Sequence, residues 1–104
     1  MKTRITLITR HIGIDKFWSR NFRTIEEAIE VGKILKNRVV ERHEIIGIVK
    51  NRDNGHRWSL QIWRPENPKS MGEILFCSRK DSTFAIKRIK EYDDTLKVKL
   101  TKLY

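Results

Sequence analysis

Five cationic side chains that could bind phosphate lie close together in the C-terminal part of the sequence: Arg79, Lys80, Lys87, Arg88 and Lys90. Lys87, Arg88 and Lys90 fall on the solvent side of an amphipathic pattern that predicts a helix. Arg79 and Lys80 precede its expected start, where the backbone N–H groups of a helix also favour anions. These residues form the best phosphate-binding candidate, and the alternative is an ordinary solvated helix face.

A second candidate is Trp63, in a segment that alternates as a strand from residue 56 to residue 64. Trp58, Leu60 and Ile62 form its apolar face. Trp63 falls on the opposite face, in the company of Arg57, Gln61 and Arg64. An aromatic ring among guanidinium and amide groups suits base stacking, which is worth ~1–3 kcal/mol per base. The structural alternative is that Trp63 packs under a loop, against Phe17 and Trp18, or in a dimer contact.

Residues 50–57 separate two expected strands, 44–50 and 56–64, and are rich in Asn, Asp, Gly, Lys and Arg. Because Asn, Asp and Gly tolerate the positive φ angles of a tight turn, we expect the two strands to form a hairpin. Its basic tip has the shape of a β-ribbon that could enter a nucleic-acid groove. Asp53 opposes this interpretation, and a purely structural turn is the alternative that we favour.

Candidate catalytic residues are few. His11, His43 and His56 are scattered, and none stands at metal-ligand spacing with Cys77. The sequence has no Gly-rich phosphate loop, nucleophile motif or paired carboxylates. We therefore expect no metal, no cofactor and no catalytic residue. The one enzymatic alternative is metal-independent RNA cleavage, which needs only a general base, a general acid and cationic groups.

The charge of the whole chain points to a polyanionic partner. Its 104 residues include 23 Lys and Arg but only 13 Asp and Glu, a formal net charge of +10. The surplus is spread along the chain, so the folded surface itself is expected to be basic. The length suits a single domain, residues 1–104, with one core. We find no signal-peptide or membrane-spanning stretch, and we expect a cytoplasmic protein that is a monomer or a small homo-oligomer.

The hydrophobic periodicities predict both strands and helices. Thr24-Ile25-Glu26-Glu27 is a capping box that starts a helix over residues 24–37, and a second helix is expected from Asp81 or Ser82 to about Tyr92. Strands are expected over 4–12, 44–50, 56–64, 73–78 and 95–102, and residues 16–22 are either a short strand or an irregular lead-in. We predict an α+β fold in which two amphipathic helices cover one face of an antiparallel sheet of about four to six strands. Each half reads as strands, a helix and a strand, so an internal duplication is possible.

Two known families have a similar order of elements. Residues 24–92 resemble double-stranded-RNA-binding domains in running helix–strand–strand–strand–helix, and the basic segment from Arg79 to Arg88 resembles the start of their second helix. Residues 45–92 are similar to the three strands and helix of AP2-type DNA-binding domains. These likenesses are of topology and charge alone, and they imply nucleic acid as the partner.

The sequence thus predicts a small basic protein that binds nucleic acid mainly through phosphates, with aromatic stacking at Trp63 as a further possibility. An interaction module that docks on an acidic protein is the alternative from another class, and a small ribonuclease is the third. The type of nucleic acid stays open.

Overall fold

The computed structural model describes residues 2–53 and 55–103, with the side chains of residues 2, 3 and 53 left out. It contains six strands and two helices in the described residues. In chain order these are β1 (Lys2–His11), β2 (Lys16–Phe22), α1 (Ile25–Lys36), β3 (His43–Asp53), β4 (Trp58–Arg64), β5 (Asn67–Phe76), α2 (Arg79–Tyr92) and β6 (Lys97–Lys102). The predicted α+β class and the order of its elements are confirmed.

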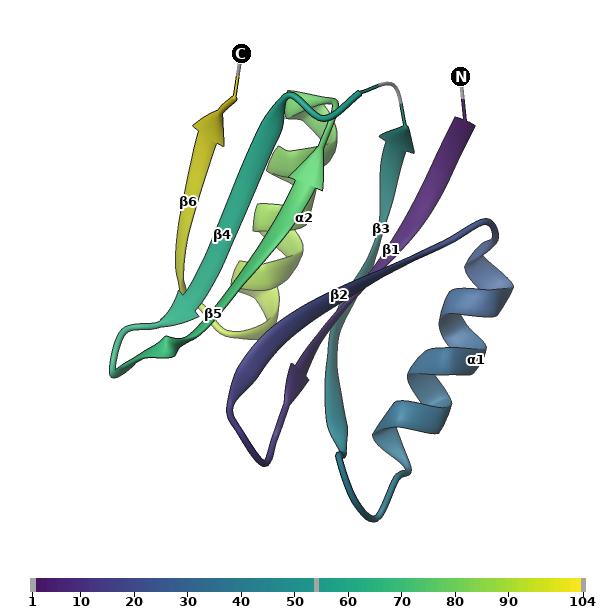
Figure 1. Cartoon of the computed structure of the whole chain (residues 1–104), viewed down its shortest axis with the longest axis vertical. Helices are drawn as coiled ribbons and strands as arrows, with labels where there is room; N and C mark the ends of the chain where they lie inside the picture. Colours follow the sequence, from purple (N-terminus) through teal and green to yellow (C-terminus); the bar gives the residue numbers. More distant parts are fainter. Residues whose placement is uncertain (1, 54, 104) are drawn as a thin grey trace.

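The strands form two antiparallel sheets of three strands each, and the two sheets have the same topology. Sheet A has the order β2-β1-β3, and sheet B has the order β5-β4-β6. In each half of the chain a hairpin is followed by a helix, and the next strand returns to pair with the first (Figure 1). The strands–helix–strand pattern of the sequence therefore corresponds to a repeated ββαβ unit.

The expected hairpin between residues 44–50 and 56–64 is wrong. β3 pairs with β1 along its whole length, and β4 pairs with β5 and β6 in the other sheet. Asn51, expected in the turn, is a buried strand residue whose amide donates to the Thr6 hydroxyl (3.0 Å) and to the carbonyl of Leu75 (2.9 Å). Asn54, at the expected tip, lies outside the described residues. The segment links the two halves, so the described residues form no β-ribbon there.

The tight turn lies one strand later, where Pro65 and Glu66 connect β4 to β5. β5 begins at Asn67, six residues before the strand that was expected over 73–78. In the described residues β3 belongs to sheet A and β4 and β5 to sheet B, so they do not form the set of three consecutive paired strands on which both family resemblances rested.

β1 is the central strand of sheet A, and both of its faces are covered. Leu7 packs with Ala28 and Leu35 of α1, whereas its neighbour Ile8 belongs to the larger core on the opposite face. This double burial explains why the apolar alternation is broken at Ile8.

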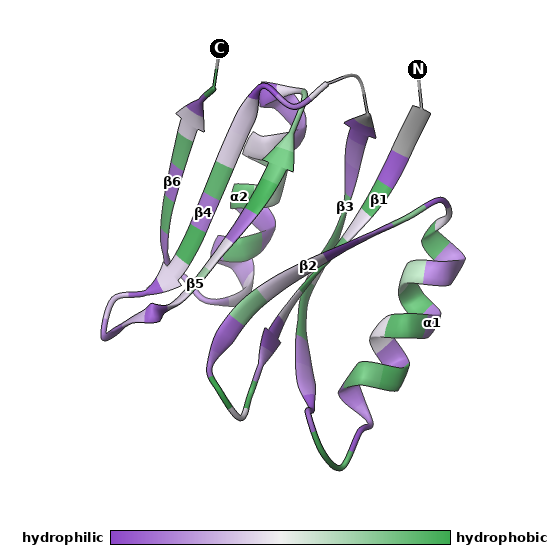
Figure 2. Ribbon diagram, in the orientation of Figure 1, coloured by the Kyte–Doolittle hydropathy of each residue, from purple (hydrophilic) through white to green (hydrophobic). Residues whose placement is uncertain are grey.

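The larger core lies between sheet A, α2 and sheet B. It contains Ile46 and Val49 of β3, Ala85 and Ile89 of α2, and Leu60 and Ile62 of β4 among its members. Figure 1 shows α1 beside sheet A and α2 between sheet B and β3. The expected single sheet with both helices on one face is therefore wrong, because the six strands form two sheets and the helices pack on opposite faces of sheet A. Figure 2 shows hydrophobic and hydrophilic residues alternating along β4 and β6, as expected for sheets with one solvated face.

Gly72 marks the crossing of the two sheets. A Cβ atom at this position would lie 2.5 Å from the carbonyl oxygen of Phe17 in β2, which is closer than atoms can approach without a shift of the backbone. β5 therefore rests directly on β2. Gly47 is less restrictive, because an added Cβ would meet the side chain of Arg88 at ordinary contact distance, its Cβ at 3.4 Å and its Cγ at 3.9 Å.

Each helix begins directly after a hydroxyl side chain that acts as its N-cap. The Thr24 hydroxyl accepts from the backbone N–H of Glu27 (3.2 Å), as the capping box predicts. The N-cap of α2 is Ser78, which accepts from the backbone N–H of Asp81 and lies three or four residues before the two residues expected to start the helix. Asp81 and Ser82 are buried in the first turn instead.

A network of polar side chains joins the two halves at the end of β1. Asp15 in the β1–β2 turn accepts from Arg10 and Arg64, and Glu44 of β3 accepts from Arg10 and from the hydroxyl of Tyr92. We call these five residues the junction network. The hydrogen bond from Asn67, together with Arg10 and Arg64, lowers the pKa of the Asp15 carboxyl, and Tyr92 and Arg10 lower that of Glu44. Ionised carboxylates therefore hold β1, sheet B and α2 together near neutral pH.

Candidate nucleic-acid interface

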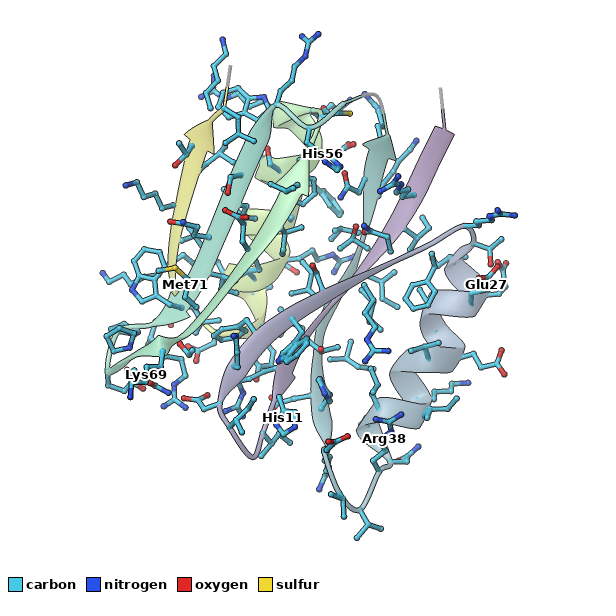
Figure 3. The ribbon with its side chains drawn as sticks, viewed as in Figure 1. His11, Glu27, Arg38, His56, Lys69 and Met71 are labelled. Atoms are coloured by element: carbon cyan, nitrogen blue, oxygen red, sulfur yellow. The ribbon has the colours of Figure 1, made fainter. Side chains whose placement is uncertain are left out.

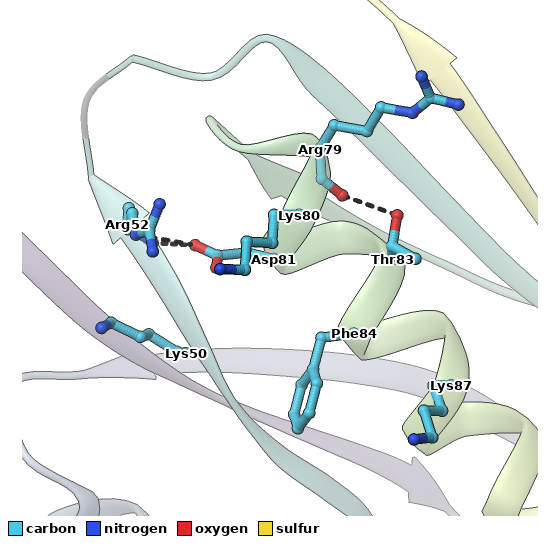
Figure 4. Close-up of a pocket in the computed structure, with 8 residues that line it drawn as sticks. All are labelled: Lys50, Arg52, Arg79, Lys80, Asp81, Thr83, Phe84 and Lys87. Atoms are coloured by element: carbon cyan, nitrogen blue, oxygen red, sulfur yellow. Dashed lines mark hydrogen bonds and ion pairs between the residues drawn. The ribbon is translucent and has the colours of Figure 1, made fainter.

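A concavity runs along the exposed side of α2, where this helix passes β3. Its volume is about 730 Å³. We call it the α2 groove (Figure 4), and it is lined by Lys50, Arg52, Arg79, Lys80, Asp81, Thr83, Phe84 and Lys87.

The contact between Asp81 and Arg52 fixes the position of α2 at the groove. The buried Asp81 carboxylate accepts from the backbone N–H of Arg52 (3.0 Å) and lies 3.9 Å from its side-chain Nε. This brings the first turn of α2 next to the end of β3. Lys50, two residues earlier in β3, then lies on the same groove as Lys80 and Lys87 (Figure 4).

The groove is strongly cationic. Five Lys and Arg side chains line it, and the one carboxylate among its described lining residues, that of Asp81, faces Arg52. Lys50, Lys80 and Lys87 are exposed, and within the described part of the chain none of them forms an ion pair. Their charges are therefore available to an anionic ligand.

Phe84 supplies the apolar part of the groove. Its side chain is 47% exposed, and the guanidinium of Arg88 lies 5.5 Å from the centre of its ring. Sequence reasoning missed this residue. The available signal was an aromatic side chain three or four residues from Lys80, Lys87 and Arg88, on the face of the helix that is otherwise charged.

The structure brings four of the predicted residues together. Arg79, Lys80 and Lys87 line the groove, and Arg88 stacks on its Phe84. Arg79 also lies over the ring of Trp58, at 5.7 Å. Two further groove cations, Lys50 and Arg52, come from β3 and were expected in a hairpin tip.

Lys90 lies apart from the groove. Its ammonium donates to the carbonyls of Asp94 and Leu96, just beyond the end of α2. It therefore anchors the connection to β6 and has a structural role in the free protein.

The remaining predicted residues belong to β4 and its edges. Register places Trp63 opposite Lys97 and Gln61 opposite Lys99, on the face of sheet B that points away from α2. Arg57 is exposed just before β4. Arg64 forms ion pairs with Asp15 and Glu66, so its charge is already neutralised in part. Sheet B thus separates these residues from the α2 groove, and the two predicted surfaces are not one.

The rings of His11 and His43 are in contact, and His11 lies at the end of the fold opposite to His56 (Figure 3). His11 and His43 pair across β1 and β3, and their ring centres are 4.9 Å apart. His43 is buried, and its Nδ1 lies 2.8 Å from the Thr9 hydroxyl. Burial, together with the nearby His11, Arg20 and Arg38, lowers its pKa.

The rings of the two histidines touch edge to face, and because His43 is buried, His11 is the member of the pair that solvent reaches. Among the described residues, no three His, Cys, Asp or Glu side chains are placed to hold a metal ion.

No family model, curated protein or solved structure matches this chain. Over the described residues, neither helix is long and apolar enough to cross a membrane.

Proposed function

We propose that the protein binds nucleic acid, and that the α2 groove holds the phosphate backbone. The observation that supports this most is a set of three lysines that form no ion pair within the described residues and converge on one concave surface: Lys50 from β3, and Lys80 and Lys87 from α2. Lysine and arginine side chains that neutralise phosphates release condensed counterions, and this release drives binding without any need for a defined base sequence.

The start of α2 adds to the attraction. The N-terminal end of a helix carries a partial positive charge, which favours phosphate. Arg79 and Lys80 occupy this end, and the groove opens beside them. The formal net charge of +10 raises the association rate further.

A mobility-shift assay at 50 mM salt tests the proposal with four probes: single- and double-stranded DNA, and single- and double-stranded RNA. We expect micromolar binding to at least one of them, with affinity falling steeply as salt rises. Absence of any shift at 50 mM salt contradicts the proposal.

A different surface favours a second candidate function, docking on an acidic protein. In the loop between α1 and β3, Val39 is 99% exposed and Val40 is 75% exposed, and Arg38 and Arg42 flank them. The same loop contains Glu41, which lies 3.8 Å from Arg38. Exposed aliphatic side chains beside cations suit an acidic protein surface with an apolar centre. A pull-down from nuclease-treated lysate, with wild type beside a variant carrying Val39→Ser and Val40→Ser, tests it. A partner that only the wild type retains supports this function, and equal recovery by both contradicts it.

A further inference from the structure

We infer that the α2 groove takes single-stranded nucleic acid, with one unstacked base against the ring of Phe84. This inference rests on the proposed function and names the form of nucleic acid that the groove recognises. It depends on the position of one aromatic side chain among the groove cations.

Phe84 is placed where a nucleotide chain would pass. In Figure 4 its ring projects from α2 into the groove, with Lys50 on one side and Lys87 on the other. Phosphates bound at these two lysines bring the intervening nucleoside over the phenyl ring. An aromatic ring flanked by cations is the arrangement by which single strands are held, because base faces stack on the ring while the cations follow the backbone.

The ring of Phe84 is also accessible to a stacking base. The guanidinium of Arg88 lies over it at 5.5 Å, and 47% of the side chain is still exposed to solvent. A base that covers this exposed part removes apolar surface from water and needs no rearrangement of α2. The groove volume of about 730 Å³ lies within the range of small-ligand pockets, so a single nucleotide fits in it.

A duplex gains nothing from Phe84. In double-stranded nucleic acid each base face is covered by its neighbours, and only base edges are open in the grooves. A phenyl ring carries no hydrogen-bond donor or acceptor for these edges. Duplex binding would therefore use the groove lysines alone, whereas a single strand uses the lysines and the ring.

The test compares three fluorescently labelled probes of equal length by anisotropy: oligothymidine, an abasic strand of the same charge, and a duplex. The variant is Phe84→Leu, which keeps an apolar side chain and changes no charge. The matched control is Trp18→Leu, because Trp18 is another exposed aromatic, 44% exposed with Lys16 over its ring at 5.9 Å, on a different part of the fold.

We expect wild type to bind oligothymidine about 5- to 150-fold more tightly than the abasic strand, the range given by one stacked base. Phe84→Leu should remove most of this difference and leave abasic-strand binding, duplex binding and the salt dependence unchanged. Trp18→Leu should behave as wild type. Thermal unfolding of both variants checks that the fold is retained.

Two results overturn the inference while the proposed function stands: equal wild-type affinity for the oligothymidine and abasic probes, or full retention of oligothymidine affinity in Phe84→Leu. An equal loss of duplex and single-strand binding in Phe84→Leu also overturns it, because the ring would then act without selecting single strands. If no probe binds wild type at low salt, the proposed function fails as well.

Discussion

The salt dependence of binding gives the sharpest test of where nucleic acid lies on this protein. The groove offers four cations for phosphate, Lys50, Arg79, Lys80 and Lys87, since Arg52 faces Asp81. For single strands, log K falls against log salt with a slope of ~0.7 per phosphate neutralised. Four contacts give a slope of about −2.8. The affinity of wild type should then fall about 50-fold between 50 and 200 mM salt.

The perturbation is the pair Lys80→Ala and Lys87→Ala. Both side chains are exposed on α2, and alanine is a good helix former, so the fold should be retained. Removing two of four contacts halves the slope to about −1.4. Affinity should fall about 60-fold at 50 mM salt and about tenfold at 200 mM, because each contact contributes less as salt rises.

The matched control is the pair Lys33→Ala and Lys36→Ala on α1. These lysines are also exposed on a helix, and neither forms an ion pair within the described residues. Both double variants lower the net charge by two, so a general effect of charge would affect them equally. Fluorescence anisotropy with one oligonucleotide at four or more salt concentrations gives the slopes. Equal slopes for the two pairs would refute the assignment of the phosphates to the α2 groove.

Three further predictions concern stability and can be measured by chemical or thermal unfolding. Gly72→Ala should destabilise the protein by about 1–3 kcal/mol, because its Cβ meets backbone at 2.5 Å, whereas Gly47→Ala should be tolerated. Similar stabilities of the two glycine variants would contradict direct packing of β5 on β2. The pKa of the Asp15 carboxyl is lower in the folded protein than in the unfolded chain, where it is about 4. The ionised carboxylate therefore contributes its full stabilisation above pH ~4, and this contribution is lost as the pH falls through the folded pKa. Asp15→Asn should therefore be less stable than wild type at pH 7 but lose less stability between pH 6 and pH 3, and parallel pH profiles would exclude this role. Trp58→Ala should lower the free energy of unfolding by about 2–3 kcal/mol, because this residue packs against the core. Trp63→Ala, on the other face of β4, should lower it by about 1 kcal/mol or less. Equal losses of stability would contradict the placement of the two rings on opposite faces.

The local features of the fold could be predicted from the sequence. The helix over residues 25–36 follows from its cap and its apolar stripe, and the strand over 97–102 follows from the alternation of Leu96, Val98 and Leu100 with Lys97 and Lys99. β6 lies at the edge of sheet B, where such lysines oppose pairing with another chain. These signals depend only on residues close together in the chain.

Strand partners could not be predicted in the same way. A period of two identifies a strand but carries no information on its neighbour, so β3 and β4 were expected to pair because a turn-rich segment lies between them. The burial of Asn51, which decides against a turn there, depends on Thr6 and Leu75 from distant parts of the sequence. The start of α2 was misplaced for a related reason. Ser78, Asp81 and Ser82 can all act as caps, and a tertiary hydrogen bond to Arg52 commits Asp81 to the first turn.

The same limit applies to the candidate site. The cations of α2 were found because helical periodicity places them on one face, but their companions on β3 belong to the other half of the chain. Lys90 was included for its charge, although the carbonyls that it contacts lie beyond the end of the helix. Phe84 was missed because the sequence patterns used to find the core and the phosphate-binding surface were an apolar stripe and a cluster of basic residues, and an isolated aromatic residue on a charged helix face belongs to neither.

Among the described residues, the two helices differ in their surroundings and in their charge. α1 lies on the outer face of sheet A and has two basic and three acidic residues, whereas α2 has five basic and two acidic residues and lies between sheet B and β3. The exposed side of α2 therefore forms the α2 groove together with β3, the edge strand of sheet A, and cations from both halves of the chain line this groove. Neither ββαβ unit alone contains the groove, since Lys50 and Lys80 come from different units. Any nucleic acid bound there would contact both halves at once, and its binding would stabilise their association by mass action.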